Sequence, residues 1–242
     1  MPTDDDAGLA GEVAVGNNAL AAAGQSDLVW GHASLRDPAG RGAWMKASGW
    51  GFEEVTPERV VLVARDGGVV AGTGRRHIEF PIHLEVMAAR PDVGSVVHTH
   101  GAAATAFASL AVPLRALSHD GVEFALPPVP RHTRTGSLIR TAELGRALAD
   151  TVGDGPGCLI PQHGLVTVGP DLATAVMRAM LLDRACAQQL RAMAAGHPVL
   201  WSDDEELRLK QAEVWPPEQI RAGYRYLVRK AAASGGASAP DA

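Results

Sequence analysis

The chain has 242 residues, of which 46% are hydrophobic and 20% are charged, and its formal net charge is −5. This length allows one sizeable core, and the mild acidic excess, without clustered lysine or arginine, argues against nucleic-acid binding. No apolar stretch reaches the ~20 residues that span a bilayer. The acidic segment Met1–Asp6 is unlike a secretory signal, so we expect a cytoplasmic protein with no membrane partner.

The spacing of apolar residues predicts helices and strands between two loose ends. We expect residues 1–6 and 232–242 to be disordered, because they are polar or rich in small residues, and residues 7–231 to form one domain. Predicted helices cover residues 9–23, 81–90, 102–110, 137–152 and 171–195, with further helix over 203–230 that is interrupted by Pro216 and Pro217. Predicted strands cover residues 27–36, 94–98, 158–161 and 165–168, and residues 60–64 and 69–71 form a hairpin. Because there is no strict βαβ repeat, we predict an α/β fold with a central, mainly antiparallel sheet flanked by helices.

The strongest local signal for chemistry is His98-Thr99-His100, which ends a predicted strand. Side chains at i and i+2 of a strand point to the same face, so two imidazoles can chelate one cation. The alternative is a pair of histidines that hydrogen-bond at a strand end without metal.

A second signal is His163, which lies in a turn between two predicted strands. Three histidines with an open position form a catalytic metal geometry. Glu79, just before a predicted helix, is either a further ligand or acid/base, or simply a carboxylate at a helix N-terminus. The loops around His32 and at Ser48-Gly49 either offer N–H groups to an anion or are plain turns.

These residues belong to an ordered set of motifs through which the chain resembles the class II aldolase/adducin family over Leu9–Gln189. The motifs are G-x-x-S-x-R (Gly31–Arg36), Ser48-Gly49, E-x-x-x-H (Glu79–His83), R-P-D-x-x-x-V-V-H-T-H (Arg90–His100) and His163-Gly164. The resemblance implies one divalent metal ion per subunit, held by His98, His100 and His163, with Glu79 as acid/base. It also implies a homotetramer with active sites at subunit interfaces. The metal remains open among Zn²⁺, Mn²⁺ and Fe²⁺, since all three accept imidazole.

Two departures from the sugar-phosphate aldolases of that family affect the expected substrate. His32 stands where those enzymes usually have asparagine, and His77-Ile78 replaces a Ser-Ser pair that helps to bind phosphate. Isoleucine has no hydrogen-bond donor for a phosphate oxygen. The patterns G-H-x-S-x-R, E-x-P-I-H and S-H-D-G (Ser118–Gly121) are closer to a branch that contains decarboxylases of hydroxylated aromatic or pyridine carboxylic acids.

The resemblance therefore favours a metal-dependent carbon–carbon lyase, a decarboxylase of a hydroxylated aromatic carboxylic acid. Glu79 or His119 would deliver the proton. Arg75 or Arg76 would pair with a substrate carboxylate. The remaining candidates for substrate binding are His32, Ser34, Ser48 and Gly49.

Three other functions stay open at this point. One is an aldolase or dehydratase of a small hydroxy-carbonyl substrate, and another is a non-haem Fe(II) oxygenase. The third, an adducin-like module without catalysis, is disfavoured because all three metal histidines are present.

Some other side chains have weaker claims to a role. His83 lies either behind the site or in the core, and a C-terminal tyrosine, Tyr224 or Tyr226, is a further candidate acid. We expect no role for His77, His132 and His197.

Overall fold

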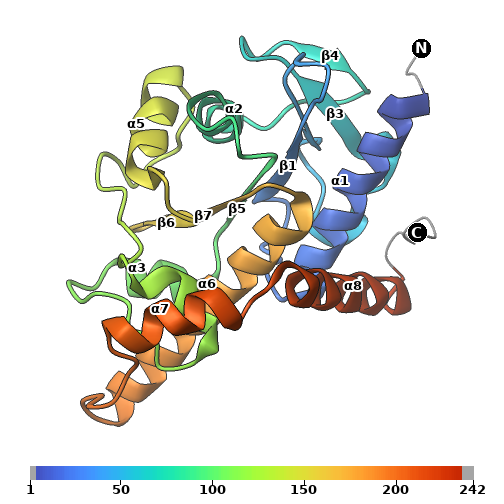
Figure 1. The fold of residues 1–242 in the computed structure, drawn as a ribbon. Helices are drawn as coiled ribbons and strands as arrows, with labels where there is room; N and C mark the ends of the chain where they lie inside the picture. The colour runs from blue at the N-terminus through green and yellow to red at the C-terminus, as the bar shows by residue number, and fades with distance from the viewer. Residues whose placement is uncertain (1–3, 236–242) are drawn as a thin grey trace.

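The computed structural model describes residues 4–235, in which seven strands form one sheet (Figure 1). The sheet order is β4-β3-β2-β1-β5-β7-β6, and every neighbouring pair is antiparallel. The strands are β1 (His32–Arg36), β2 (Ala43–Lys46), β3 (Val60–Val63), β4 (Val69–Ala71), β5 (Ser95–Thr99), β6 (Gly157–Ile160) and β7 (Gly164–Gly169). The predicted fold class, an antiparallel sheet with flanking helices, is confirmed.

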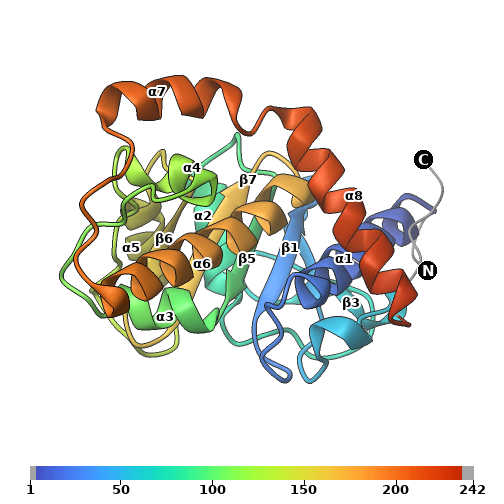
Figure 2. The same ribbon diagram turned by 90° about the horizontal axis from the view of Figure 1, so that it is seen from below.

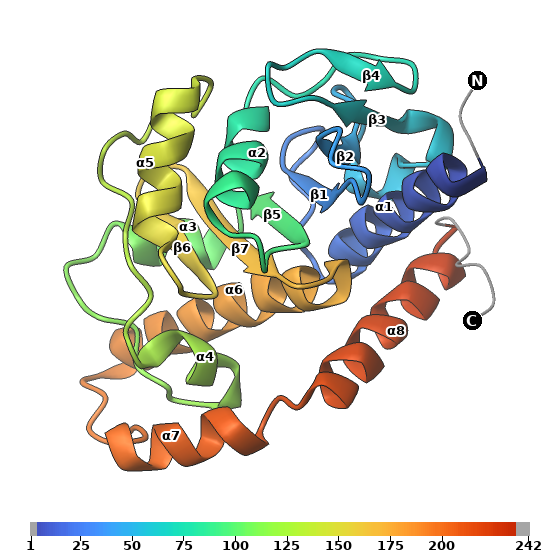
Figure 3. The same ribbon diagram turned by 45° about the horizontal axis from the view of Figure 1, so that its top comes forward.

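Helices cover both faces of the sheet. One face carries α1 (Asp4–Ala22), α3 (Ala102–Ala108), α6 (Leu172–Ala195) and α8 (Pro217–Ala233), which Figure 2 shows from below. The other face carries α2 (Phe80–Ala89) and α5 (Ala142–Val152), which come forward in Figure 3. The short α4 (Val122–Ala125) and α7 (Asp204–Glu213) pack on each other. Three 3₁₀ turns complete the elements: η1 (Phe52–Glu54), η2 (Pro57–Arg59) and η3 (His119–Gly121).

The alternation of strand side chains decides which face each residue serves. Val97 and Leu165 join the core beneath α6, whereas Val96 and Val166 join the core beneath α2 and α5. His98 shares the parity of Val96, so its imidazole lies on the α2 face. His98 therefore faces the side of the sheet that, within residues 4–235, α2 and α5 cover.

The structure corrects the predicted ends of the chain. Helix α1 begins at Asp4, so the prediction of disorder is wrong for residues 4–6, and the Asp6 carboxylate lies 2.6 Å from the Arg41 guanidinium. Helix α8 continues through Ala233, beyond the predicted start of the tail at residue 232. The rest of the two predicted loose ends, residues 1–3 and 236–242, lies outside the described residues.

Two internal elements also differ from the prediction. Strand β2 was not predicted, because four residues between two glycine-rich loops carry little periodic signal. Helix α5 begins only at Ala142, capped by the Thr141 side chain, and the preceding residues run past Glu79 instead. Among the described residues, none of the helices combines the length and apolar character that crossing a bilayer requires.

Candidate metal centre

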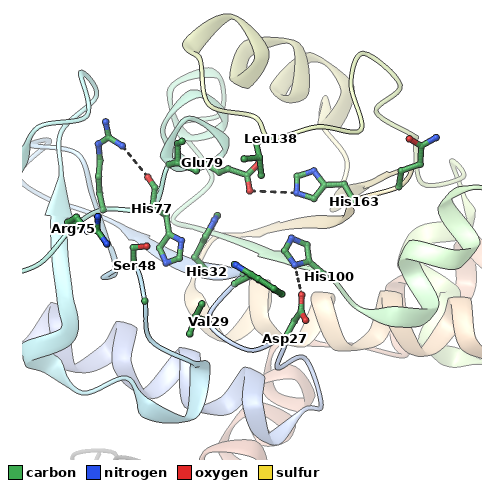
Figure 4. Close-up of a pocket in the computed structure, with 16 residues that line it drawn as sticks. Asp27, Val29, His32, Ser48, Arg75, His77, Glu79, His100, Leu138 and His163 are labelled. Carbon is green, nitrogen blue, oxygen red and sulfur yellow. Dashed lines mark hydrogen bonds and ion pairs between the residues drawn. The ribbon is translucent and has the colours of Figure 1, made fainter.

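Three histidines lie close together near the ends of two neighbouring strands, and Figure 4 shows two of them, His100 and His163, beside the pocket. His98 lies in β5, His100 follows its end, and His163 occupies the turn between β6 and β7. Because β5 pairs with β7, Thr99 lies opposite Leu165 and brings the turn beside the end of β5. The Nε2 atoms of His98 and His100 are 3.2 Å apart, and one ring nitrogen from each of the three residues lies within 4.8 Å of the others. The three predicted ligands are thus close enough to hold one metal ion.

Hydrogen bonds orient two of these imidazoles. His98 Nδ1 lies 2.9 Å from the carbonyl oxygen of Leu165, and His100 Nδ1 lies 2.8 Å from a carboxylate oxygen of Asp27. Since both partners are acceptors, each Nδ1 carries the proton and each Nε2 keeps a free lone pair toward the shared centre. Such outer partners commonly fix the ring orientation of metal ligands. The buried Nδ1 of His163 has no hydrogen-bond partner among the described residues.

Glu79 faces the same centre from the α2 side. Its Oε2 lies 3.6 Å from His163 Nε2 and 3.8 Å from His98 Nε2, and its Oε1 accepts the Ile139 N–H at 2.7 Å. Glu79 is the N-cap residue of α2, but its side chain accepts no capping hydrogen bond from the first turn of that helix. Burial raises the pKa of Glu79, but the hydrogen bond with His163, the nearby His98 and His163 rings and the Ile139 N–H outweigh it and lower the pKa to about 2. The carboxylate is therefore ionised near neutral pH.

A second cluster of histidines, formed by His32, His77 and His83, lies beside the first, and the His32 and His98 ring centroids are 5.2 Å apart. His32 Nδ1 is 2.6 Å from His83 Nε2, and His83 Nδ1 is 2.6 Å from the Ser34 hydroxyl. The His77 ring lies against the His32 ring in a tilted arrangement, with ring centroids 4.5 Å apart and an interplanar angle of 53°. Burial lowers the pKa of His83 to about 4 and that of His77 to about 3, and it lowers the pKa of His32 well below its usual value. These rings are neutral near neutral pH; His32 and His83 hydrogen-bond each other and His83 also bonds Ser34, whereas the buried Nε2 of His77 has no hydrogen-bond partner within residues 4–235.

The two clusters border a pocket of about 720 Å³. Its polar lining includes His32, His77, Glu79, His100 and His163, with Ser48, Gly49 and Arg75 at the other end. Its apolar lining comes from Val29, Trp30, Ile78 and Leu138. The expectation that His77 has no role is not supported, because its ring lines this pocket, whereas His83 is buried behind it.

The two predicted arginines differ in their surroundings. The Arg76 Nε donates to the Gly67 carbonyl at 2.6 Å, and its guanidinium lies 4.2 Å from the centre of the Phe80 ring. Arg75 is exposed and lines the pocket, and its guanidinium makes no hydrogen bond or ion pair within residues 4–235. Both arginines line the pocket, but Arg76 also supports the β3–β4 turn, whereas the Arg75 guanidinium has no such contact within residues 4–235 and is the candidate cation for a ligand.

Two predicted site residues lie outside the pocket. The Ser34 side chain is fully buried, because strand alternation places it two residues along from His32 and beneath α2, where it bonds His83. His119 is exposed in η3, which packs on α6 at the opposite face of the sheet. Within one chain, His119 therefore lies on the other side of the sheet from Glu79 and does not line the same pocket.

The C-terminal tyrosines also have different positions. The Tyr224 side chain packs on the core beneath α8, its buried hydroxyl has no partner among the described residues, and burial raises its pKa beyond the usual range. Tyr226 is exposed on α8. Neither lines the pocket of its own chain.

Sequence reasoning missed Asp27 and Leu138 at this site. Asp27 accepts a hydrogen bond from His100, which is 73 residues away in sequence. Leu138 lines the pocket from the segment before α5. No local pattern marks either residue, because each depends on which strands and loops become neighbours.

Comparison with known proteins agrees with this geometry. Residues 11–190 match the class II aldolase and adducin N-terminal domain. The chain is 36% identical over 157 residues to the decarboxylase NovR of Streptomyces niveus, covering 64% of this chain and 58% of that protein. It is 36% identical over 155 residues to a 4-hydroxy-3-prenylphenylpyruvate oxygenase/4-hydroxy-3-prenylbenzoate synthase of Streptomyces roseochromogenus subsp. oscitans, covering 63% and 56%. The chain thus spans less than two thirds of the length of either relative.

Solved structures share the fold over almost the whole chain. An L-fuculose 1-phosphate aldolase from Glaciozyma antarctica PI12 superposes with a TM-score of 0.83 and 25% identity, covering 98% of this chain and 93% of that one. An aldolase II superfamily protein from Pseudomonas syringae gives a TM-score of 0.83 at 24% identity, covering 96% and 95%. The ordered motifs, the sheet and the family match lead to one conclusion: this chain belongs to the class II aldolase and adducin family.

Proposed function

We propose that this protein is a metal-dependent carbon–carbon lyase, and specifically a decarboxylase of a hydroxylated aromatic carboxylic acid. The observation that carries the proposal is the convergence of three imidazoles beside an ionised Glu79 at one end of a pocket. His98, His100 and His163 would hold the ion. Their donor set of neutral nitrogens suits a divalent cation and leaves its charge undiminished. When bound, such an ion stabilises the negative charge that develops on a substrate oxygen as a carbon–carbon bond breaks.

The apolar walls favour an aromatic substrate over a sugar. Leu138 lies on the Glu79 side of the pocket and Val29 on the other, with imidazoles between them (Figure 4). Trp30, Ile78 and Leu138 remain 53%, 49% and 45% exposed, so a planar ring would bury large apolar surfaces on binding. A polyhydroxylated substrate would gain little there.

Arg75 would bind a carboxylate of the substrate from the end opposite the metal centre. Its guanidinium is uncommitted within residues 4–235, and a planar fork matches a carboxylate in a bidentate pair. His32 and His77 line the space between, and Ser48 and Gly49 line the Arg75 end; these residues would contact the polar groups of the substrate.

Glu79 would move the proton. Its carboxylate is ionised before substrate binds and is therefore in the form that can accept a proton, which the ring hydroxyl would supply. When the bond between the ring carbon and the carboxylate carbon breaks, CO₂ departs and the electron pair of that bond stays on the ring carbon. Glu79 would then return the proton to that carbon. The Ile139 N–H keeps the carboxylate aimed at the pocket throughout.

The names of two relatives support this choice and also raise an alternative. One is called a decarboxylase, and the other both an oxygenase and a synthase of a hydroxybenzoate. A non-haem Fe(II) oxygenase is therefore the second candidate, since His₃ sites also accept iron. Oxygen uptake that requires both Fe²⁺ and substrate would identify it, whereas a simple decarboxylase consumes no oxygen.

We also propose, from the family resemblance, a cytoplasmic homotetramer with sites at subunit interfaces. In such an assembly the exposed His119 would act only if a neighbouring chain presented it to the pocket. Light scattering of the purified protein measures the mass, and a monomer at working concentration would contradict the tetramer.

The direct test of function is CO₂ release from a panel of ortho-hydroxy aromatic carboxylic acids. The protein is loaded separately with Mn²⁺, Fe²⁺ or Zn²⁺, and His98→Ala serves as the inactive variant. Metal-dependent release that the variant lacks would support the proposal. No release from any acid, with one ion bound per chain, would contradict it and favour cleavage or dehydration of an unphosphorylated hydroxy-carbonyl compound.

A further inference from the structure

Lys46 ends strand β2 and is fully buried, with 0% of its surface exposed. A buried lysine is rare, because its ammonium loses hydration. Among the described residues it forms no ion pair. Its Nζ instead donates to two backbone carbonyls, those of Val29 at 2.8 Å and Trp50 at 2.5 Å. Burial lowers the pKa of Lys46 to about 8, against the opposing effect of Glu54 and Glu53.

The two carbonyls belong to two different walls of the pocket. Val29 lies in the loop of residues 27–31, and Trp50 lies in the turn of residues 48–51. The first segment lines the pocket with Val29 and Trp30, and the second lines it with Ser48 and Gly49. One buried side chain therefore ties together two segments that are distant in sequence and share the substrate space.

The first of these loops holds an unfavourable backbone conformation. Leu28 has a φ of 52°, in the left-handed region that leucine rarely adopts, and Gly31 has a φ of 70°. Such a conformation persists only where surrounding contacts enforce it, and it is often found at functional sites. The hydrogen bond from Lys46 falls on the residue next to Leu28. At the start of the same loop, Asp27 accepts the hydrogen bond that orients His100.

We propose that Lys46 is a positioning residue that holds the loop of residues 27–31 against the turn of residues 48–51, and thereby sets the pocket wall and the orientation of His100. The part that concerns His100 rests on the proposed metal site, whereas the part that concerns the loop does not. Lys46 acts through the backbone and need not contact substrate or metal.

The test is Lys46→Met, which keeps the length of the side chain and removes every donor. Hydrogen exchange of metal-free protein, followed by mass spectrometry, should be at least about tenfold faster over residues 27–31, because the loop opens locally. Mn²⁺ affinity should fall about threefold to tenfold. This is less than the loss of about 10–100-fold expected when the hydrogen-bond partner of a metal ligand is itself removed. The melting temperature should not fall, since a buried charge disappears. Lys230→Met is the matched control, because it removes a surface hydrogen bond from a lysine to the Ala22 carbonyl. It should change neither the exchange rate of residues 27–31 nor the Mn²⁺ affinity.

A second substitution separates positioning from a general structural role. In the Lys46→Met background, Leu28→Gly should recover part of the Mn²⁺ affinity, because glycine adopts a positive φ without strain. Wild-type exchange and wild-type Mn²⁺ affinity in folded Lys46→Met would overturn the proposal. Failure of both Lys46→Met and Lys46→Gln to fold would also overturn it, because a positioning residue is dispensable for folding. If wild-type protein binds no Mn²⁺, the metal site fails, and the exchange data still decide the role of Lys46.

Discussion

Two clusters of histidines lie side by side on one face of the sheet, yet their hydrogen bonds differ in kind. In the first, His98 and His100 each bind an oxygen acceptor through Nδ1, so that Nε2 faces a shared point. In the second, His32 and His83 bind each other, and His83 binds Ser34. The chemical role of an imidazole is thus set by what its other nitrogen contacts. We expect the first cluster to hold the metal and the second to shape the pocket as neutral rings.

Replacing the carboxylate beside the first cluster should have the largest effect on turnover. Glu79→Gln keeps the shape but removes the base, so kcat should fall about 10²–10⁴-fold, the range typical of general acid–base groups. Metal content should remain at one ion per chain. Turnover within threefold of wild type would exclude Glu79 as the proton carrier.

Removing the outer partner of one ligand should weaken metal binding without abolishing it. Asp27→Asn loses the charge that orients His100, and the metal Kd should rise about 10–100-fold. Asp66→Asn, on the exposed β3–β4 turn, is the control and should leave the Kd unchanged. Equal affinities in the two variants would show that the Asp27 contact does not orient a ligand.

A substitution within the second cluster should change stability and leave metal binding intact. His83→Phe leaves His32 and Ser34 without their partner in a buried place, which should cost about 1–3 kcal/mol of unfolding free energy. Urea unfolding measures the loss, and the exposed His197→Phe should show none. Loss of metal from His83→Phe would contradict the separation of the two clusters.

The second cluster should also make the metal-free protein sensitive to mild acid. His77 and His83 have folded pKa values of about 3 and about 4, below the value near 6.5 of an exposed histidine. The unfolded state then binds more protons, so their contribution is complete above about pH 6.5 and is lost as pH falls toward 4. Each ring contributes a slope of at most about 1.4 kcal/mol per pH unit. Melting temperatures between pH 7 and 4.5 in EDTA should fall less steeply for His77→Asn, and an unchanged slope would contradict this account.

The sequence predicts those parts of the site that depend on residues close together in the chain, and it does not predict those that depend on contacts between distant segments. His98 and His100 could be paired from strand alternation alone, whereas His163 and Glu79 were separate local candidates that the family resemblance joined to the same site. The same alternation places His32 and Ser34 on one face, but it gives no sign of which element covers that face or that Ser34 is buried outside the pocket. Asp27, Lys46 and Leu138 were missed because their roles arise from contacts between loops that only the folded chain brings together. Arg75 and Arg76 are equivalent in the sequence, and only the positions of Gly67 and Phe80 distinguish them.

The most direct test of the account is metal content, measured by elemental analysis after loading and desalting, for wild type, His98→Ala and His83→Phe. We predict one divalent ion per chain in the wild type and in His83→Phe, and none in His98→Ala. Retention of a stoichiometric ion by folded His98→Ala would contradict the assignment of the metal to the first cluster.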